Sequence, residues 1–183
     1  MSDEPKIETI SSTLVYESPW LKVRHDEVQF ADGSFGVYNI VERGDFVAVI
    51  ALDDDGSIYL VEQFRYGSQS RMIELPMGGV DAKFGPEPID SARGELLEET
   101  GMLAAEMIAV GRMETNASYM RQTLHIFLAT GLEKREQALE PGELGLTVHR
   151  LPISEVEQLI RDGRLTNEHT MAAFCLARLK GMI

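Results

Sequence analysis

A nearly continuous run of apolar residues at positions 46–52 predicts a strand at the centre of a sheet. A strand with apolar side chains at successive positions is buried on both faces, because other elements cover both sides of its sheet. Residues 57–64 form a second, mostly apolar strand, and the acidic and glycine residues at 53–56 are typical of a turn between the two. These two strands are the expected core of the main domain.

The first 45 residues predict a small antiparallel β unit that precedes this domain. Residues 21–30 and 35–41 have strand-like composition, and the Asp32-Gly33 dipeptide lies between them. Asp-Gly is favoured in hairpin turns because both residues tolerate a positive φ angle. We therefore expect two domains, an N-terminal β unit at residues 1–45 and a larger domain at residues 46–183.

Helical periodicity begins in the second half of the chain. Residues 90–100 are expected to form a helix, with Asp90 as its N-cap and Gly101 in the left-handed position that ends it. Further strands are predicted at residues 107–113, 124–130 and 146–150, a helix from a capping box at Ser154 and Glu157 to about Arg161, and a last helix from Thr166 or Asn167 to about Lys180. Strands before, between and after helices indicate a mixed α/β or α+β sandwich.

Composition is that of an ordinary globular protein. The chain has 183 residues, of which 44% are hydrophobic and 26% are charged, so one main domain is expected. The sequence lacks the run of about 18 apolar residues that a membrane helix needs. Residues 1–6 are polar and acidic, unlike a targeting segment, so a soluble cytoplasmic protein is expected.

The formal net charge of −13 argues against a nucleic-acid partner, because binding to a phosphate backbone depends on clustered basic residues. A protein rich in carboxylates is instead suited to hard cations, which prefer oxygen ligands. Cys175 is the single cysteine of the sequence, which excludes an internal disulfide, and its apolar neighbours predict a position in the core.

The most informative feature is the acidic face of the helix at 90–100. Glu95, Glu98 and Glu99 lie three and four positions apart, so their carboxylates share one face and repel one another. A divalent cation would turn this repulsion into attraction, since Mg²⁺ binds a few carboxylates together with water and phosphate oxygens. Taken alone, such a run is more often a solvated surface.

The residues before this helix make the pattern specific. Glu74-Leu75-Pro76-Met77-Gly78-Gly79 is followed by an irregular loop, the acidic helix and Thr100-Gly101-Met102. The stretch from Gly78 to Met102 resembles the Nudix box. The resemblance implies a Nudix-type α/β/α sandwich with a mixed sheet. It also implies a set of metal-site residues: Glu95 and Glu99 as ligands, Glu98 as a ligand or orienting acid, and the Gly78 carbonyl as a further ligand.

The first half of the box departs from the family pattern. Gly94 stands where the family has an arginine that braces the helix glutamates, Pro86 stands where it has an early glutamate, and two extra residues follow Gly78. Arg93 is adjacent to position 94 but points about 100° away on the helix. Three outcomes remain open: a slow enzyme, an enzyme braced by a lysine or arginine from elsewhere, or a ligand sensor.

Outside the box the chain is similar over nearly its whole length to the ADP-ribose pyrophosphatase branch of the family. The similarity rests on residues 20–24, 41–44, 60–66 and 161–166, in this order and spacing. It implies Mg²⁺-dependent hydrolysis, with Mn²⁺ as an alternative, of the pyrophosphate in ADP-ribose or another nucleoside diphosphate sugar. It also implies a homodimer formed through residues 1–45, in which the partner completes the nucleoside pocket.

Four residues are candidates for substrate contacts. Trp20 and Arg43 can each stack on adenine, although Trp20 could equally be a buried anchor at a dimer or hairpin seam. Arg65 at a strand end could bind a phosphate, or it could be an ordinary surface arginine. Glu74 could bond a ribose or support the metal site, or it could form a salt bridge that stabilises the turn.

Hydrolysis at phosphorus needs an activated water, and in this branch the general base is a glutamate of a late loop. Residues 137–145 contain two acids, Glu143 and Glu140, of which Glu143 is preferred because it lies nearer the following strand. A second hypothesis is a Nudix-fold ligand-binding or regulatory module with little hydrolysis, which the loss of the bracing arginine at position 94 would favour.

Overall fold

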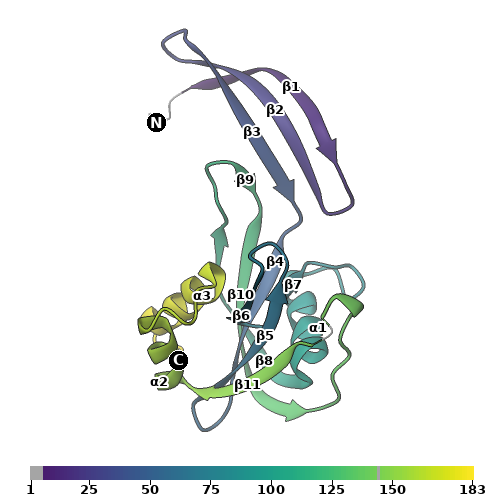
Figure 1. Cartoon of the computed structure of the whole chain (residues 1–183), viewed down its shortest axis with the longest axis vertical. Coiled ribbons are helices and arrows are strands. Elements are labelled where there is room, and N and C mark those ends of the chain that lie inside the picture. Colours follow the sequence, from purple (N-terminus) through teal and green to yellow (C-terminus); the bar gives the residue numbers. More distant parts are fainter. Residues whose placement is uncertain (1–5, 144) are drawn as a thin grey trace. The chain divides into compact units, whose positions relative to one another are not determined.

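A computed structural model describes residues 6–143 and 145–183, which form two compact units (Figure 1). The N-terminal unit contains the described residues up to Asp45 together with Glu114–Thr123, and the main unit contains Phe46–Met113 and Leu124–Ile183. The first five residues, which led us to expect no targeting segment, lie outside the described part. No helix in the described ranges is long and apolar enough to cross a membrane.

The N-terminal unit is a sheet with the strand order β1-β2-β3-β9: β1 (Ile7–Glu17), β2 (Leu21–Phe30), β3 (Phe35–Arg43) and β9 (Met120–Arg121). Its first three strands are antiparallel, and Gly33 has a φ of 86° in the β2–β3 turn, as the Asp-Gly dipeptide predicts. β9 pairs with β3 in parallel, and the Gln122 side chain donates to the Gly44 carbonyl at 2.7 Å. Glu114–Thr123, which the sequence analysis placed in the larger domain, therefore packs with this unit.

The main unit contains a mixed sheet with the strand order β11-β5-β4-β10-β8: β11 (Thr147–Pro152), β5 (Ser57–Arg65), β4 (Phe46–Leu52), β10 (Thr123–Lys134) and β8 (Met102–Glu114). β10 runs parallel to β4, whereas β11 runs antiparallel to β5. Two short strands that the sequence analysis missed also join, β6 (Ser70–Glu74) beside β5 and β7 (Met77–Gly79) beside β4. The prediction of a central strand at 46–52 is confirmed.

Helices cover both faces of this sheet: α1 (Pro88–Thr100) on one face, and α2 (Ile153–Arg161) and α3 (Glu168–Leu179) on the other (Figure 1). β4 explains the arrangement, because its alternate side chains enter two different cores. Val47 and Val49 pack with Leu96 of α1, whereas Ile50 packs in the cluster that contains Phe174 of α3. This is the expected α/β/α sandwich.

Helix boundaries differ from the sequence prediction at two places. α1 begins at Pro88 with Glu87 as N-cap, and Asp90 lies in the first turn, where its Oδ2 accepts the Glu87 backbone N–H at 3.2 Å. Asp90 is therefore not the N-cap, because Pro88 already has the φ angle of a first helical residue. α2 begins at Ile153 without a side-chain cap, so the capping box expected at Ser154 is wrong.

Two other terminal predictions are confirmed. Gly101 ends α1 with a φ of 71°, and the Asn167 side chain caps α3 by accepting the Thr170 N–H at 2.8 Å. The core position predicted for Cys175 is wrong, since this residue is exposed. The apolar residues around Cys175 belong to a helix of which only one face packs on the sheet, and Cys175 lies on the other face.

Candidate metal and catalytic site

Two buried glutamates of α1 form the centre of the candidate site. Glu99 is 1% exposed and Glu95 is 8% exposed. Both face strand β7, where the Met77 backbone N–H donates to Glu99 Oε2 at 3.0 Å. A Cβ atom on Gly78 would overlap the Glu95 carboxylate, so the glycine leaves the space in which that carboxylate lies. Strand β7, absent from the sequence prediction, thus positions both acids.

A third glutamate reaches this pair from a distant part of the chain. One carboxylate oxygen each of Glu95, Glu99 and Glu143 lie within 4.8 Å of one another. Glu143 ends a short 3₁₀ turn after β10, and one of its oxygens accepts the Glu140 backbone N–H at 2.9 Å. The Gln137 side chain ties the same segment to α1 by donating to the Glu99 carbonyl at 2.5 Å.

The electrostatics of this group favour a bound cation. Burial, and then the charges of Glu98 and Glu143, raise the pKa of Glu95 to about 7. Burial also raises the pKa of Glu99 to about 9, and the neighbouring Glu95 and Glu143 add to the effect. Ionised carboxylates held this closely need a positive charge among them. The donors are all oxygens, as Mg²⁺ and Mn²⁺ prefer, so Glu95, Glu99 and Glu143 fit such an ion.

The other two acids proposed from the sequence lie next to a lysine. Lys83 Nζ is 2.7 Å from Glu140 Oε1 and 3.5 Å from Glu98 Oε2. Glu98 and Glu140 are not members of the three-oxygen group described above. Sequence reasoning did not single out Lys83, because nothing in its local sequence shows that the loop returns to the helix.

Position 94 has a packing reason to be glycine. A Cβ atom there would overlap the ring of Phe84, which therefore covers the helix backbone at that position. Arg93 does not replace the missing arginine, since its guanidinium donates to the Ala104 carbonyl at 3.1 Å. Its side chain thus points away, as the helix geometry predicts.

Glu74 and Arg65 form a second charged group of the main unit. Glu74 is 1% exposed, and its carboxylate accepts Nε and Nη2 of Arg65 at 2.9 and 2.6 Å. Asn167 donates to the same carboxylate at 2.9 Å. These contacts favour the salt-bridge role for Glu74 over a ribose contact. Arg65 is partly exposed, and its Nη1 makes no hydrogen bond within residues 6–143 and 145–183.

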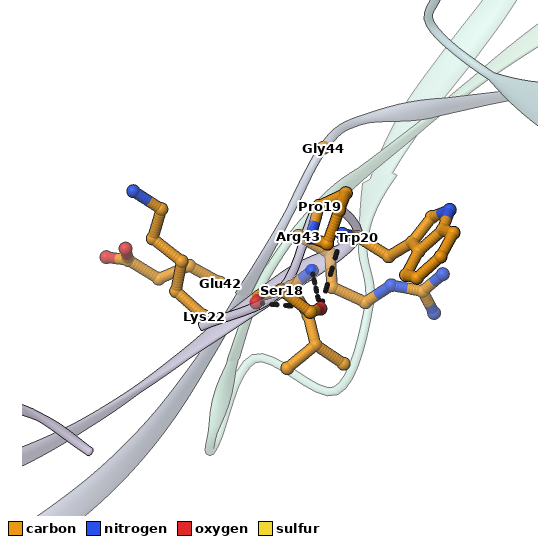
Figure 2. A pocket seen from close by; sticks show the side chains of 8 residues that line it. Ser18, Pro19, Trp20, Lys22, Glu42, Arg43 and Gly44 are labelled. Atoms are coloured by element: carbon orange, nitrogen blue, oxygen red, sulfur yellow. Dashed lines mark hydrogen bonds between the residues drawn. The ribbon is translucent and has the colours of Figure 1, made fainter. Parts of the chain in front are cut away.

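Trp20 and Arg43 lie in the N-terminal unit and line one pocket of about 220 Å³ (Figure 2). Both side chains extend to the same side of the strand ends, opposite to Lys22 and Glu42. The Ser18 hydroxyl accepts the Trp20 and Leu21 backbone N–H groups, which fixes the turn that carries the indole. Trp20 is 76% exposed, so within one chain it is not a buried anchor.

Comparison with known families agrees with this geometry. A model described as the nucleoside diphosphate sugar hydrolase N-terminal domain matches residues 7–41, and the NUDIX domain model matches residues 42–174. The chain belongs to the Nudix family. The three glutamates whose oxygens lie within 4.8 Å of one another are all in the part matched by the Nudix model.

Individual relatives place this Nudix protein more closely. It is 31% identical over 171 residues to the ADP-ribose pyrophosphatase of Mycobacterium tuberculosis. This alignment covers 92% of this chain and 82% of that protein. It is 28% identical to the ADP-ribose pyrophosphatase of Bacillus subtilis, over 94% of this chain and 92% of that protein. It is 29% identical to the methanol dehydrogenase activator of Bacillus methanolicus, over 90% of this chain and 89% of that protein. The resemblance to the ADP-ribose pyrophosphatase branch is confirmed, and with it the class of enzyme, a Nudix pyrophosphohydrolase.

A solved structure shares the fold. The crystal structure of an ADP compounds hydrolase superimposes with a TM-score of 0.82 at 23% identity and covers 97% of this chain and 95% of that one. This similarity confirms the predicted fold class, an α+β sandwich preceded by antiparallel strands.

Proposed function

We propose that this Nudix protein hydrolyses the pyrophosphate bond of ADP-ribose or another nucleoside diphosphate sugar in the presence of Mg²⁺, and releases a nucleoside monophosphate and a sugar phosphate. The observation that carries the proposal is the convergence of Glu95, Glu99 and Glu143 within 4.8 Å. The substrate class follows from the two pyrophosphatases among the relatives and from the N-terminal family model.

The residues of the site have distinct proposed roles. Glu95 and Glu99, with the Gly78 carbonyl as a further ligand, would hold the divalent ion, which would supply positive charge for the phosphate oxygens and a more acidic water. Glu143 accepts the proton of the attacking water. Glu140 is the weaker candidate for this base, because its carboxylate already accepts the Lys83 ammonium at 2.7 Å.

Substrate recognition is proposed for both units. Arg65 is held by Glu74 through Nε and Nη2, which leaves Nη1 to bind a phosphate oxygen. Trp20 and Arg43 line a pocket that suits stacking on a base. In the proposed homodimer, the N-terminal unit of the partner contributes to the nucleoside pocket.

The N-terminal sheet supports the proposed homodimer. Large apolar side chains are exposed on its strands: Ile7, Ile10, Leu14, Val15, Tyr16, Phe35, Val37 and Tyr38. A soluble chain rarely leaves so many apolar side chains uncovered on one small sheet unless a partner covers them.

One assay tests the proposal. Purified protein with Mg²⁺ is incubated with ADP-ribose, other sugar nucleotides, dinucleoside polyphosphates and NADH, and monophosphate release is measured. We expect release from ADP-ribose or another sugar nucleotide, and its loss when the metal is chelated. Binding of a compound without turnover of any would contradict the proposal.

A variant links turnover to the metal site. Glu99→Gln should lower kcat at least about 100-fold, because it removes the charge of a proposed ligand while the amide oxygen can still accept the Met77 N–H. Glu106→Gln, an exposed glutamate on β8, is the control and should retain full activity. Near-normal turnover by Glu99→Gln would refute the assignment of the metal site.

A second candidate function is regulatory. The relative from Bacillus methanolicus is named as an activator of methanol dehydrogenase, and the present chain lacks the box arginine at position 94. A ligand-binding regulator would bind a nucleotide in the same assay without releasing product, so the assay also separates the two candidates.

A further inference from the structure

Lys83 lies between two segments that the proposed reaction requires. Its ammonium contacts Glu98 on α1 and Glu140 in the segment of residues 135–143 that follows β10. This 135–143 segment also carries Glu143, whose carboxylate joins Glu95 and Glu99. A single cation therefore links the metal helix to the segment that supplies the third acid.

Lys83 approaches the face of α1 on which an arginine at position 94 would lie. Residues 94 and 98 are one helical turn apart, so a side chain at position 94 would extend along the same face as Glu98. Phe84 occupies that space, because a Cβ on Gly94 would overlap its ring. Lys83 Nζ lies 4.5 Å from the centroid of the same ring. The neighbouring loop thus brings a positive charge to Glu98 from outside the helix.

We propose that Lys83 is a positioning residue that replaces the box arginine: supported by the Phe84 ring over Gly94, it bridges Glu98 to Glu140 and so holds Glu143 against the metal helix. The proposal rests on the proposed hydrolytic function for its effect on turnover, but the bridge itself is a property of the chain alone. Lys83 is not proposed to touch the substrate.

Other contacts show why this bridge is needed. Gln137 and Ala138 bond to α1 carbonyls, at 2.5 Å to Glu99 and 3.1 Å to Glu98, and these contacts fix the start of the segment. Beyond residue 138, Lys83 provides the side-chain link from Glu140 back to the helix. Glu140 and Glu143 are themselves joined by hydrogen bonds, so holding Glu140 also holds Glu143.

The charge needed for the bridge is present at neutral pH. The hydrogen bond to Glu140 raises the pKa of Lys83 above its usual value, and the charges of Glu98 and Glu95 add to the effect. The pair is exposed enough for solvent to screen it, so its loss should increase opening of the segment by only about two- to fivefold.

Hydrogen exchange of residues 136–143 tests the bridge without any substrate. The full chain is compared with Lys83→Met, Lys83→Arg and Lys134→Met, a matched control because Lys134 is an exposed lysine at the end of β10. We expect exchange of this segment to be about two- to fivefold faster in Lys83→Met and close to wild type in the other two. Unchanged exchange in Lys83→Met would overturn the proposal.

Kinetics on ADP-ribose test the consequence for turnover. Lys83→Met should lower kcat by up to about two- to fivefold with little change in KM, because the general base is displaced more often while the substrate contacts remain. Lys83→Arg should restore at least half of the wild-type kcat. Faster exchange with an unchanged kcat would overturn the positioning role. If the wild-type protein releases no product, the proposed function fails, and the exchange result alone decides whether the bridge exists.

Discussion

The carboxylate of Glu95 occupies the space where a side chain on residue 78 would begin. This contact makes the first glycine of the box a requirement of packing at the site, because strand β7 runs directly beside the acidic helix. Its neighbour Gly79 is different, since a Cβ there would meet no atom within 4 Å. Two adjacent glycines therefore offer a matched comparison.

Gly78→Ala should lower kcat about 10- to 100-fold, because the added methyl group displaces the Glu95 carboxylate from its position beside Glu99. Gly79→Ala should retain nearly full activity, and both proteins should melt within a few degrees of the wild type. Steady-state kinetics and thermal melting measure these effects. Equal activity of the two variants would show that the position of Glu95 does not limit turnover.

Lys83 and Phe84 together compensate for the arginine that the box lacks at position 94. Gly94 stands where the family has an arginine on the helix, and the preceding loop places the Lys83 ammonium beside the same helix face. Of the outcomes left open by the sequence, this geometry favours an enzyme braced from elsewhere.

The residue that caps α3 also contacts the second charged group, formed by Glu74 and Arg65. Asn167 caps this helix with its Oδ1 and donates from its Nδ2 to the buried Glu74, which in turn holds Arg65. One side chain thus serves both the helix and the proposed phosphate contact.

Asn167→Ala should reduce the free energy of unfolding by about 2 kcal/mol, because it removes both the cap and a partner of a buried carboxylate. Asn167→Ser keeps a capping oxygen and should lose only about 1 kcal/mol. Urea unfolding of the three proteins measures the difference. If serine were as costly as alanine, the cap would contribute nothing and the Glu74 contact would account for the whole loss.

Strands and helices were predicted correctly where the sequence pattern that specifies them lies within a few neighbouring residues. β4 and the β2–β3 hairpin were predicted well because a continuous apolar run and an Asp-Gly turn are strong over few residues. β6 and β7 were missed because they are short and acquire their hydrogen bonds from β5 and β4. The first turn of α1 was misplaced because Pro88 begins the helix before the periodic pattern starts.

For the chain as a whole, burial of Glu95 and Glu99 should make stability depend on pH and on the proposed metal ion. The folded-state pKa values of Glu95 and Glu99, about 7 and about 9, lie above the usual value of 4.5. A group with a raised pKa stabilises the folded state fully below its unfolded pKa, and this contribution disappears as pH rises through the folded pKa.

The chelator-treated protein should therefore have a lower Tm at pH 9 than at pH 6. Saturating Mg²⁺ should reduce this fall, because the ion binds the ionised carboxylates of the folded state. Glu99→Gln should show a smaller fall without metal, since it removes the group with the higher pKa. A Tm with the same pH dependence in wild type and variant would contradict the assignment of these acids to a buried metal site.

The proposed homodimer predicts a particle of about 41 kDa, twice the chain mass of 20.4 kDa, in sedimentation velocity. Replacing Phe35 and Val37 by lysine should shift it towards the monomer, because the two side chains share one exposed face of β3. Leu179→Lys is the control, because Leu179 is an exposed apolar residue of the main unit. A wild-type monomer would exclude the dimer and with it the partner's share of the nucleoside pocket.

Local sequence patterns were sufficient to predict the features that arise within one element: the central strand, the hairpin, and three glutamates on one face of α1. They also placed the chain in the Nudix family, since the box lies within one stretch of sequence. Which of these acids lie close together depends instead on how distant segments pack. Glu143 joins Glu95 and Glu99, whereas Glu98 and Glu140 share Lys83, because sheet order brings the 135–143 segment back to a helix some 40 residues earlier in the chain. Side-chain spacing within a helix is local, but a contact between distant segments depends on the packing of all the elements between them.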